Sequence, residues 1–250
     1  MNLLLINPNI SDSVSALIRA EAQRSASPGT CIEVLTAPFG VAYIETRMEA
    51  VIGAYATLQL AAEHHARHDA VIVAAFGDPG LAGLREVLPC PVTGLSEAAL
   101  LSACLLGGRF SIVAISHRIT AWYRETVEHL GLGSRLASIR SLTSPLADIG
   151  SVQTDQGERL VALADACVDQ DGADVIVLAG APLAGLARQL KDRLRVPVVD
   201  GASSAVRHAE GLVRMAPAKA RAGSFSAPPV KPNAGLSPEL QALLARGGFA

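Results

Sequence analysis

The 250-residue sequence lacks a strong charge of either sign. It has 21 Lys and Arg against 23 Asp and Glu, which gives a formal net charge of -2 and a sequence pI near 6.3. The basic residues are scattered along the chain, whereas a nucleic-acid-binding surface needs them clustered on one face or along one helix. The composition therefore argues against a nucleic-acid partner.

The sequence also lacks a long apolar run. The apolar opening MNLLLI has no basic flank and is ended after six residues by the polar NPN. A membrane-spanning helix needs about 20 apolar residues, and a signal peptide needs a basic start. We therefore expect a cytoplasmic protein with no membrane partner.

Cysteine is sparse and is not arranged for cross-linking. Cys31, Cys90, Cys104 and Cys167 are widely spaced, with no CxxC motif and no neighbouring histidine pair. This spacing predicts neither a disulfide framework nor a zinc site. We expect four mostly buried, reduced thiols.

One histidine-rich stretch, EHHARHD, is a candidate metal cluster through His64, His65 and His68. It ends a predicted helix, where cationic and polar side chains favour the helix dipole, and adjacent histidines on a helix point apart. We therefore predict no metal site in this stretch.

Half of the residues are hydrophobic, and they form apolar runs that alternate with amphipathic segments. This alternation predicts an α/β fold, with parallel sheets covered by helices on both faces. The expected strands are residues 2–8, 31–38, 69–76, 90–95, 109–116, 135–142, 174–180 and 196–201. The expected helices are residues 11–24, 45–65, 81–87, 118–130, 154–170 and 184–194, a helix starting near residue 202, and a last helix after Ser237.

The chain contains an internal repeat. VIVAAFGDPGLAGL, residues 71–84, returns as VIVLAGAPLAGL, residues 175–186, and flanking phrases recur in the same order. The repeat predicts two pseudosymmetric lobes with parallel, four-stranded-type sheets flanked by helices. The first lobe is residues 1–98, completed by about 209–250, and the second is residues 99–208.

Parallel sheets bind ligands beyond the carboxyl ends of their strands, so the two lobes predict an active-site cleft between them. A pseudo-twofold cleft suits a reaction in which a proton leaves one face of a carbon and returns to the other. Asn9 and Ser116 are candidate side-chain donors, although the first also fits a helix cap and the second a turn. His117 is a candidate acid or base, although its position also fits a solvated histidine. The other candidate substrate-binding residues are Phe39, Phe76, Gly77 and Ala181, which supply apolar walls and backbone N–H groups.

The motifs resemble those of the aspartate/glutamate/hydantoin racemase superfamily, and within it the hydantoin and allantoin racemase branch. INPNIS opens the chain, and TAPFG, FGDPGL, LGGRFSIV and AGSFSAPP follow in order at residues 36–40, 76–81, 106–113 and 222–229. The resemblance implies two α/β lobes with the site between them, a small-molecule substrate, no metal or organic cofactor, and a homo-oligomer.

The sequence departs from this family at the two reacting positions. The resemblance implies one cysteine per lobe, acting as paired acid and base, and the matching positions hold Ala75 and Gly180. Three functions remain open. The first is a cofactor-independent racemase or isomerase, acting on a small cyclic amide or amino-acid derivative through groups other than thiols. The second is a cysteine-independent lyase, decarboxylase, cis-trans isomerase or ring hydrolase in the same cleft, and the third is a non-catalytic small-molecule binding protein.

Overall fold

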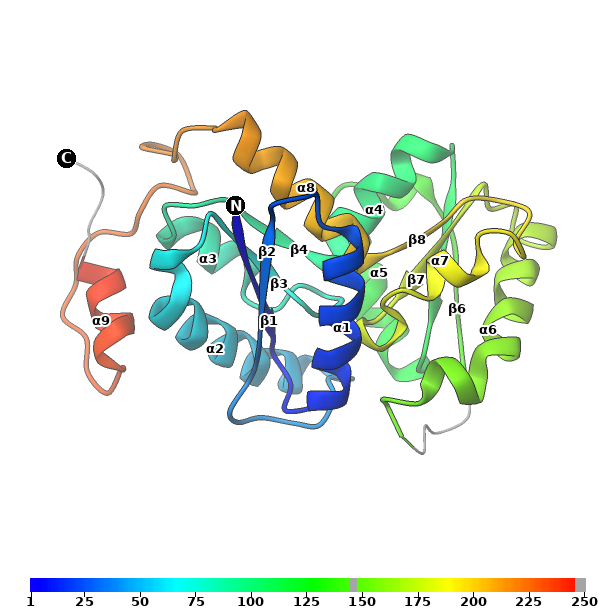
Figure 1. Ribbon diagram of the computed structural model, residues 1–250, viewed down its shortest axis with the longest axis horizontal. Coiled ribbons are helices and arrows are strands. Elements are labelled where there is room, and N and C mark those ends of the chain that lie inside the picture. The colour runs from blue at the N-terminus through cyan, green and yellow to red at the C-terminus, as the bar shows by residue number, and fades with distance from the viewer. Residues whose placement is uncertain (144–147, 246–250) are drawn as a thin grey trace.

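The computed structural model describes residues 1–143 and 148–245 and contains two parallel four-stranded sheets, which confirms the predicted α/β class (Figure 1). The first sheet has the strand order β2-β1-β3-β4, and the second repeats it as β6-β5-β7-β8. The strands of the first sheet are β1 (Asn2–Asn7), β2 (Cys31–Thr36), β3 (Ala70–Val73) and β4 (Val92–Gly94). Those of the second are β5 (Phe110–Ala114), β6 (Leu136–Ser141), β7 (Val175–Ala179) and β8 (Val198–Asp200).

Helices cover both faces of each sheet, as the apolar strands require. Successive strand residues point to opposite faces, so in β1 Leu3 and Leu5 pack in one buried cluster and Leu4 and Ile6 in another. The longer helices of the first half are α1 (Asp12–Ser25), α2 (Arg47–His64), α3 (Leu81–Val87) and α4 (Leu95–Leu106). Those of the second half are α5 (Thr120–His129), α6 (Val152–Asp169), α7 (Leu186–Leu190), α8 (Gly201–Met215) and α9 (Pro238–Ala245). Short 3-10 turns are η1 (His65–Arg67), η2 (His117–Ile119), η3 (Gly133–Arg135) and η4 (Ala181–Leu183).

The two lobes exchange a helix. Helix α4 follows the first sheet in the chain but packs against β7 and β8, and α8 follows the second sheet but packs against β3 and β4. The sequence reading missed α4, because this helix is apolar on its exposed side as well, at Leu101 and Leu105, and shows no amphipathic period. The predicted boundary at residue 98 falls within this helix, so the exact lobe limits stay a prediction.

A buried carboxylate also joins the lobes. Glu21 on α1 is 1% exposed and accepts a 2.6 Å hydrogen bond from the guanidinium of Arg188 on α7. Ser25 donates a further hydrogen bond to the same carboxylate at 2.9 Å. A buried charge is tolerated only when it is paired in this way, so this contact ties the α1 side of the first lobe to the second.

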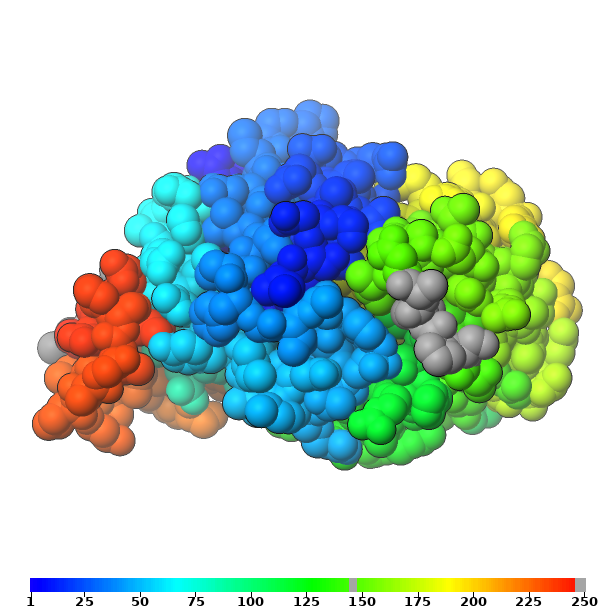
Figure 2. Space-filling model, turned by 90° about the horizontal axis from the view of Figure 1, so that it is seen from below, coloured from blue at the N-terminus to red at the C-terminus, as the bar shows by residue number. Residues whose placement is uncertain are grey.

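The C-terminal segment extends along the outside of the first lobe (Figure 2). Its helix α9 packs against α2, and Leu243 is buried in the cluster that contains Leu60 and Leu84. As predicted, Ser237 caps this helix by accepting a hydrogen bond from the backbone N–H of Leu240. No helix within residues 1–143 and 148–245 is long and apolar enough to span a membrane.

The cysteines are more accessible than the sequence suggested. Cys167 is buried, Cys90 and Cys104 are partly buried, and Cys31 is exposed. The expectation of four mostly buried thiols is therefore wrong for Cys31, because this residue begins β2 at the edge of the first sheet.

Candidate functional site

The carboxyl ends of β1, β3, β5 and β7 meet around a small cavity between the two lobes, which we call the interlobe cavity. Its volume is about 30 Å³, enough for a water molecule. The chain positions that form it come from both halves of the repeat, as the parallel topology predicts. The lining residues are Asn9, Tyr43, Ile44, Ala75, Phe76, Ile115, Ile119, Tyr123, Gly180, Ala181 and Pro182.

Ala75 and Gly180, which are predicted to match the two family cysteines, both line this cavity. Ala75 follows β3 and is 7% exposed. Gly180 follows β7 with φ at +124°, a backbone conformation that a residue with a side chain rarely adopts. None of the four cysteines, all of which lie in the described part of the chain, lines the cavity.

The turn after Gly180 is held in place from α6. The Nε2 amide of Gln153 donates hydrogen bonds to the backbone oxygens of Pro182, at 2.8 Å, and Ala184, at 3.0 Å. Ala181 and Pro182 therefore keep their positions at the cavity wall.

Asn9 is oriented by its neighbours on the β1–α1 turn. Its Oδ1 accepts hydrogen bonds from the buried Nδ2 of Asn7, at 3.0 Å, and from the backbone N–H of Ser11, at 2.9 Å. Asn7 is in turn fixed by a 2.9 Å hydrogen bond from its Nδ2 to the Ser15 hydroxyl. Because these contacts use Oδ1, the Asn9 side chain offers its Nδ2 amide as a donor at the cavity.

Tyr43 reaches the cavity from the segment between β2 and α2. It lies beside the side chains of Glu45, in its own lobe, and of Ser116, in the other lobe. Burial is the main cause that raises the pKa of Tyr43, and the adjacent Glu45 carboxylate raises it further. Tyr43 is therefore a neutral hydroxyl at physiological pH.

Tyr123 enters the cavity from α5 in the second lobe. It is 2% exposed, and its ring packs against that of Phe76 with the ring centroids 4.7 Å apart. Burial raises the pKa of Tyr123, and the charges of Asp78 and Tyr43 act in the same direction. Within residues 1–143 and 148–245, no group hydrogen-bonds the Tyr123 hydroxyl, so this neutral donor is available to a ligand in the cavity it lines.

The turn after β3 separates the cavity from a second hollow. Phe76 faces the cavity, whereas Gly77 lies under the indole of Trp122, where a Cβ would come within 2.3 Å of the ring. The backbone N–H of Gly77 donates to the Ser96 hydroxyl. The close approach of Trp122 therefore requires glycine at position 77.

Asp78, in the same turn, caps the start of helix α4. Its carboxylate accepts hydrogen bonds from the backbone N–H groups of Ser96 and Glu97, both at 2.9 Å, in the first turn of α4. Burial raises the pKa of Asp78 to about 7, although both hydrogen bonds oppose the shift. These contacts give Asp78 the structural role of a helix cap that fixes the turn.

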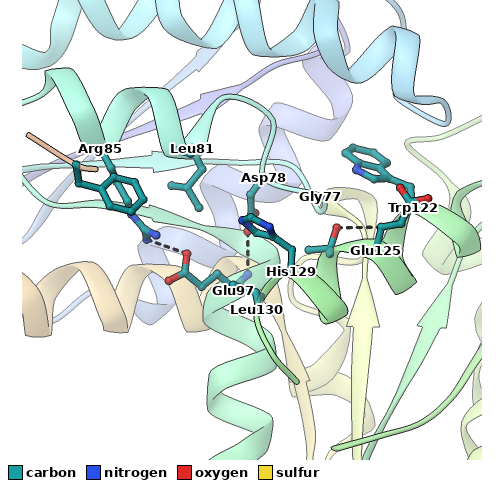
Figure 3. Close-up of a pocket in the computed structure, with 12 residues that line it drawn as sticks. Gly77, Asp78, Leu81, Arg85, Glu97, Trp122, Glu125, His129 and Leu130 are labelled. Carbon is teal, nitrogen blue, oxygen red and sulfur yellow. Dashed lines mark hydrogen bonds and ion pairs between the residues drawn. The ribbon is translucent and has the colours of Figure 1, made fainter. Parts of the chain in front are cut away.

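The second hollow, which we call the outer pocket, lies between α3 and α5 and has a volume of about 310 Å³ (Figure 3). Arg85 and Glu97 form an ion pair at one end, 2.8 Å apart, and Trp122 and Glu125 lie at the other. Its lining carries charges of both signs, and its carboxylates are engaged by backbone N–H groups or arginines. Neither Ala75 nor Gly180 lines this pocket.

The structure brings most of the predicted site residues together. Asn9, Phe76 and Ala181 line the interlobe cavity together with Ala75 and Gly180. Ser116 is 7% exposed and lies beside Tyr43, but it does not itself line the cavity. The remaining predicted residues lie elsewhere: Gly77 lines the outer pocket, Phe39 is 37% exposed and packs against Tyr55, and His117 is exposed in η2.

The sequence reading missed the two cavity tyrosines. Tyr43 follows the carboxyl end of a predicted strand. The rule that ligands bind beyond the carboxyl ends of parallel strands, which selected Asn9, therefore applies to the segment of Tyr43 as well. Tyr123 lies inside a helix and carries no local signal, because only the packing of α5 against Phe76 brings it to the cavity.

In the histidine-rich stretch, the side chains contact nearby protein groups. His68 lies 3.0 Å from a carboxylate oxygen of Glu33, and Nδ1 of His65 lies 2.9 Å from the backbone oxygen of Ala61. No group of three or more possible ligands within the described residues is arranged to hold a metal ion.

Comparisons with known proteins place this geometry in a family. A model of the family described as Asp/Glu/Hydantoin racemase matches residues 3–209. The hydantoin racemase of Paenarthrobacter aurescens is 35% identical over 236 residues, which is 92% of this chain and 99% of that protein.

Two solved structures are similar over nearly the whole chain. Allantoin racemase from Klebsiella pneumoniae superposes with a TM-score of 0.91 at 32% identity, covering 96% of this chain and 98% of the other. Allantoin racemase from Pseudomonas fluorescens gives 0.88 at 33% identity, covering 94% and 100%.

Proposed function

Because the chain belongs to the Asp/Glu/hydantoin racemase family, we propose that it removes and returns the acidic proton of a small cyclic amide or amino-acid derivative in the interlobe cavity. The protein is a racemase-like enzyme of the isomerase class. The observation that carries the proposal is that Ala75 and Gly180, one from each lobe, line one cavity.

The polar groups of the cavity support a neutral cyclic amide as the substrate. The Asn9 amide and the hydroxyls of Tyr43 and Tyr123 are hydrogen-bond donors suited to carbonyl oxygens. Among the described residues, those that line the cavity include no Lys, Arg or His. A free dicarboxylate would need such cations for charge pairing, so the lining favours an uncharged ring.

The cavity must enlarge to admit such a ring. A volume of about 30 Å³ holds a water molecule, and a five-membered ring is several times larger. Tyr43 of the first lobe lies beside Ser116 of the second, so the proposal requires these two residues to separate when substrate enters. Closure around the substrate then excludes water from the reacting carbon.

The proposal also covers the location, assembly and cofactor requirement of the enzyme. It acts as a cytoplasmic homo-oligomer on a small molecule, without a metal or organic cofactor, as its family resemblance implies. Size-exclusion chromatography with light scattering measures the assembly, and a monomer at assay concentration would contradict this part.

The test is a substrate screen in D₂O. Enantiopure 5-substituted hydantoins, allantoin, and dicarboxylates with their amides are incubated with the protein and followed by optical rotation and by mass. We expect a cyclic amide to lose optical rotation and gain one deuterium. A product of different mass would instead indicate lyase, decarboxylase or hydrolase chemistry, and saturable binding without exchange would indicate a binding protein.

A further inference from the structure

The outer pocket has no part in the proposed function, yet it has the size of a ligand site. Small-molecule sites span about 300–1,000 Å³, and the volume of this pocket is about 310 Å³. Its apolar wall is built from separate parts of the chain: Leu81 on α3, Trp122 on α5, Leu130 just after α5, and Phe225 on the C-terminal segment. The pocket therefore results from the packing of distant segments and not from one loop.

One end of the pocket contains a carboxylate with unfilled hydrogen-bonding capacity. The Oε2 atom of Glu97 is buried and accepts no hydrogen bond from any group in residues 1–143 and 148–245, although the Arg85 guanidinium lies 2.8 Å away. Arg85 instead donates from Nε and Nη2 to the backbone oxygen of Val92, at 3.0 and 2.9 Å. The pair is thus matched in charge but not in hydrogen bonding. An unsatisfied buried acceptor is uncommon in native proteins and favours a site for an additional donor.

The other end of the pocket combines an aromatic face with a second carboxylate. Trp122 and Glu125 lie there, one turn apart on α5 (Figure 3). Glu125 pairs with Arg47, but both side chains of this pair are exposed, so solvent screens the interaction. An indole face attracts a cation, and carboxylates accept charge-assisted hydrogen bonds from it.

We propose that the outer pocket is a second ligand site, which binds a flat organic cation with its ring against Trp122 and its N–H groups directed to the Glu97 carboxylate. An anion fits this lining poorly. Arg85 is already engaged by Val92 and Glu97, and His129 is exposed to solvent.

The outer pocket and the interlobe cavity are lined by neighbouring residues. In the turn after β3, Phe76 lines the cavity and Gly77 lines the pocket. In α5, Tyr123 lines the cavity and Trp122 lines the pocket. The ring centroids of Trp122 and Tyr123 lie 6.1 Å apart, and those of Tyr123 and Phe76 lie 4.7 Å apart. A ligand that moves Trp122 therefore also moves a wall of the cavity, which links the two sites.

The binding test uses the fluorescence of Trp122, because it is the only tryptophan of the chain. The protein is titrated with benzamidine, benzamide and benzoate, which share one ring and differ in charge, and calorimetry measures the same binding in parallel. We expect saturable binding of benzamidine and at least about tenfold weaker binding of the other two. Equal binding of all three, or no saturable binding of benzamidine by either method, would overturn the inference.

Variants locate the ligand. Glu97→Gln keeps the shape of the side chain but removes its charge, and it should weaken benzamidine binding about tenfold. Glu125→Gln changes an exposed residue that does not threaten folding, and it should weaken binding about threefold. Glu128→Gln is the matched control, because Glu128 also lies on α5 but does not line the outer pocket. Thermal midpoints confirm folding. Unchanged affinity in both pocket variants, or an equal loss in the control, would place benzamidine elsewhere and overturn the inference.

The link between the two sites is tested with 3-fluorotyrosine in place of tyrosine, followed by ¹⁹F NMR. The three resonances are assigned with Tyr43→Phe and Tyr55→Phe. We expect benzamidine to shift the Tyr123 resonance and to leave that of Tyr55, which lines neither site, in place. An unshifted Tyr123 resonance at saturation would overturn the link. None of these measurements depends on turnover, so this inference and the proposed function fail or stand separately.

Discussion

Ala75 and Gly180 line one cavity from opposite lobes, but only Ala75 has a backbone that a cysteine can share. Gly180 has φ at +124°, and Ala75 is not among the described non-glycine residues with positive φ. A cysteine at position 75 therefore fits the existing backbone, whereas a cysteine at position 180 strains it.

Gly180→Cys should destabilise the fold by about 1–3 kcal/mol, because its side chain strains a backbone region that glycine occupies freely. Ala75→Cys should cost less, since it adds one atom beside an existing cavity. Urea unfolding of both variants gives the two free energies of unfolding. Equal losses would show that the Gly180 backbone relaxes at no cost.

Alkylation of the native protein should leave turnover nearly intact. Iodoacetamide should modify Cys31 first, because it is exposed. Burial raises the pKa of Cys90 to about 11 and raises that of Cys167 as well, so both thiols stay protonated and unreactive at pH 8. Mass spectrometry maps the modified cysteines, and Cys31→Ser is the control. Inactivation that follows one cysteine and is prevented by substrate would place a thiol in the reaction.

Arg188→Ala should lower the free energy of unfolding by about 1–3 kcal/mol. It leaves the carboxylate of Glu21 buried without its main partner, and the half-exposed position of Arg188 moderates the loss. Arg193→Ala is the matched control, because its pair with Glu158 is exposed and screened by solvent, so its loss should change stability little. Similar losses in urea titrations of the two variants would contradict the role of Glu21 as a buried lobe contact.

The stability of the protein should carry a pH dependence that Asp200→Asn removes. Burial raises the pKa of Asp200 to about 6, whereas an unfolded aspartate titrates near 3.9. Between pH 4 and 6 the folded state therefore keeps a proton that the unfolded state has lost, and the free energy of unfolding falls as pH rises, by about 2–3 kcal/mol. The difference in free energy of unfolding between the unchanged protein and Asp200→Asn should therefore change between pH 4 and 6. A constant difference would mean that Asp200 ionises normally in the folded state.

The strands and the interlobe location of the cavity could be predicted because each depends on a local pattern. Apolar runs between polar turns marked β1, β3, β5 and β7, and parallel topology then placed their carboxyl ends together. Asn9, Phe76 and Ala181 followed from that single rule.

The rest depends on packing that no local pattern records. Helix α4 packs against β7 and β8 of the other lobe, and its apolar sequence does not indicate which of its sides does so. Tyr123 reaches the cavity only because α5 packs against Phe76. Phe39 lies in a strand-end loop like Asn9, yet its ring turns to Tyr55 on α2, so a position at a strand end does not fix where a side chain points.

A crystal structure with 5-methylhydantoin bound tests the central claim most directly, because it shows which residues surround the reacting carbon. We expect the ring in an enlarged interlobe cavity, with C5 between Ala75 and Gly180, a carbonyl oxygen within hydrogen-bonding distance of the Tyr123 hydroxyl, and the Asn9 amide beside the ring. Binding of the hydantoin in the outer pocket against Trp122, with the interlobe cavity closed, would contradict the account.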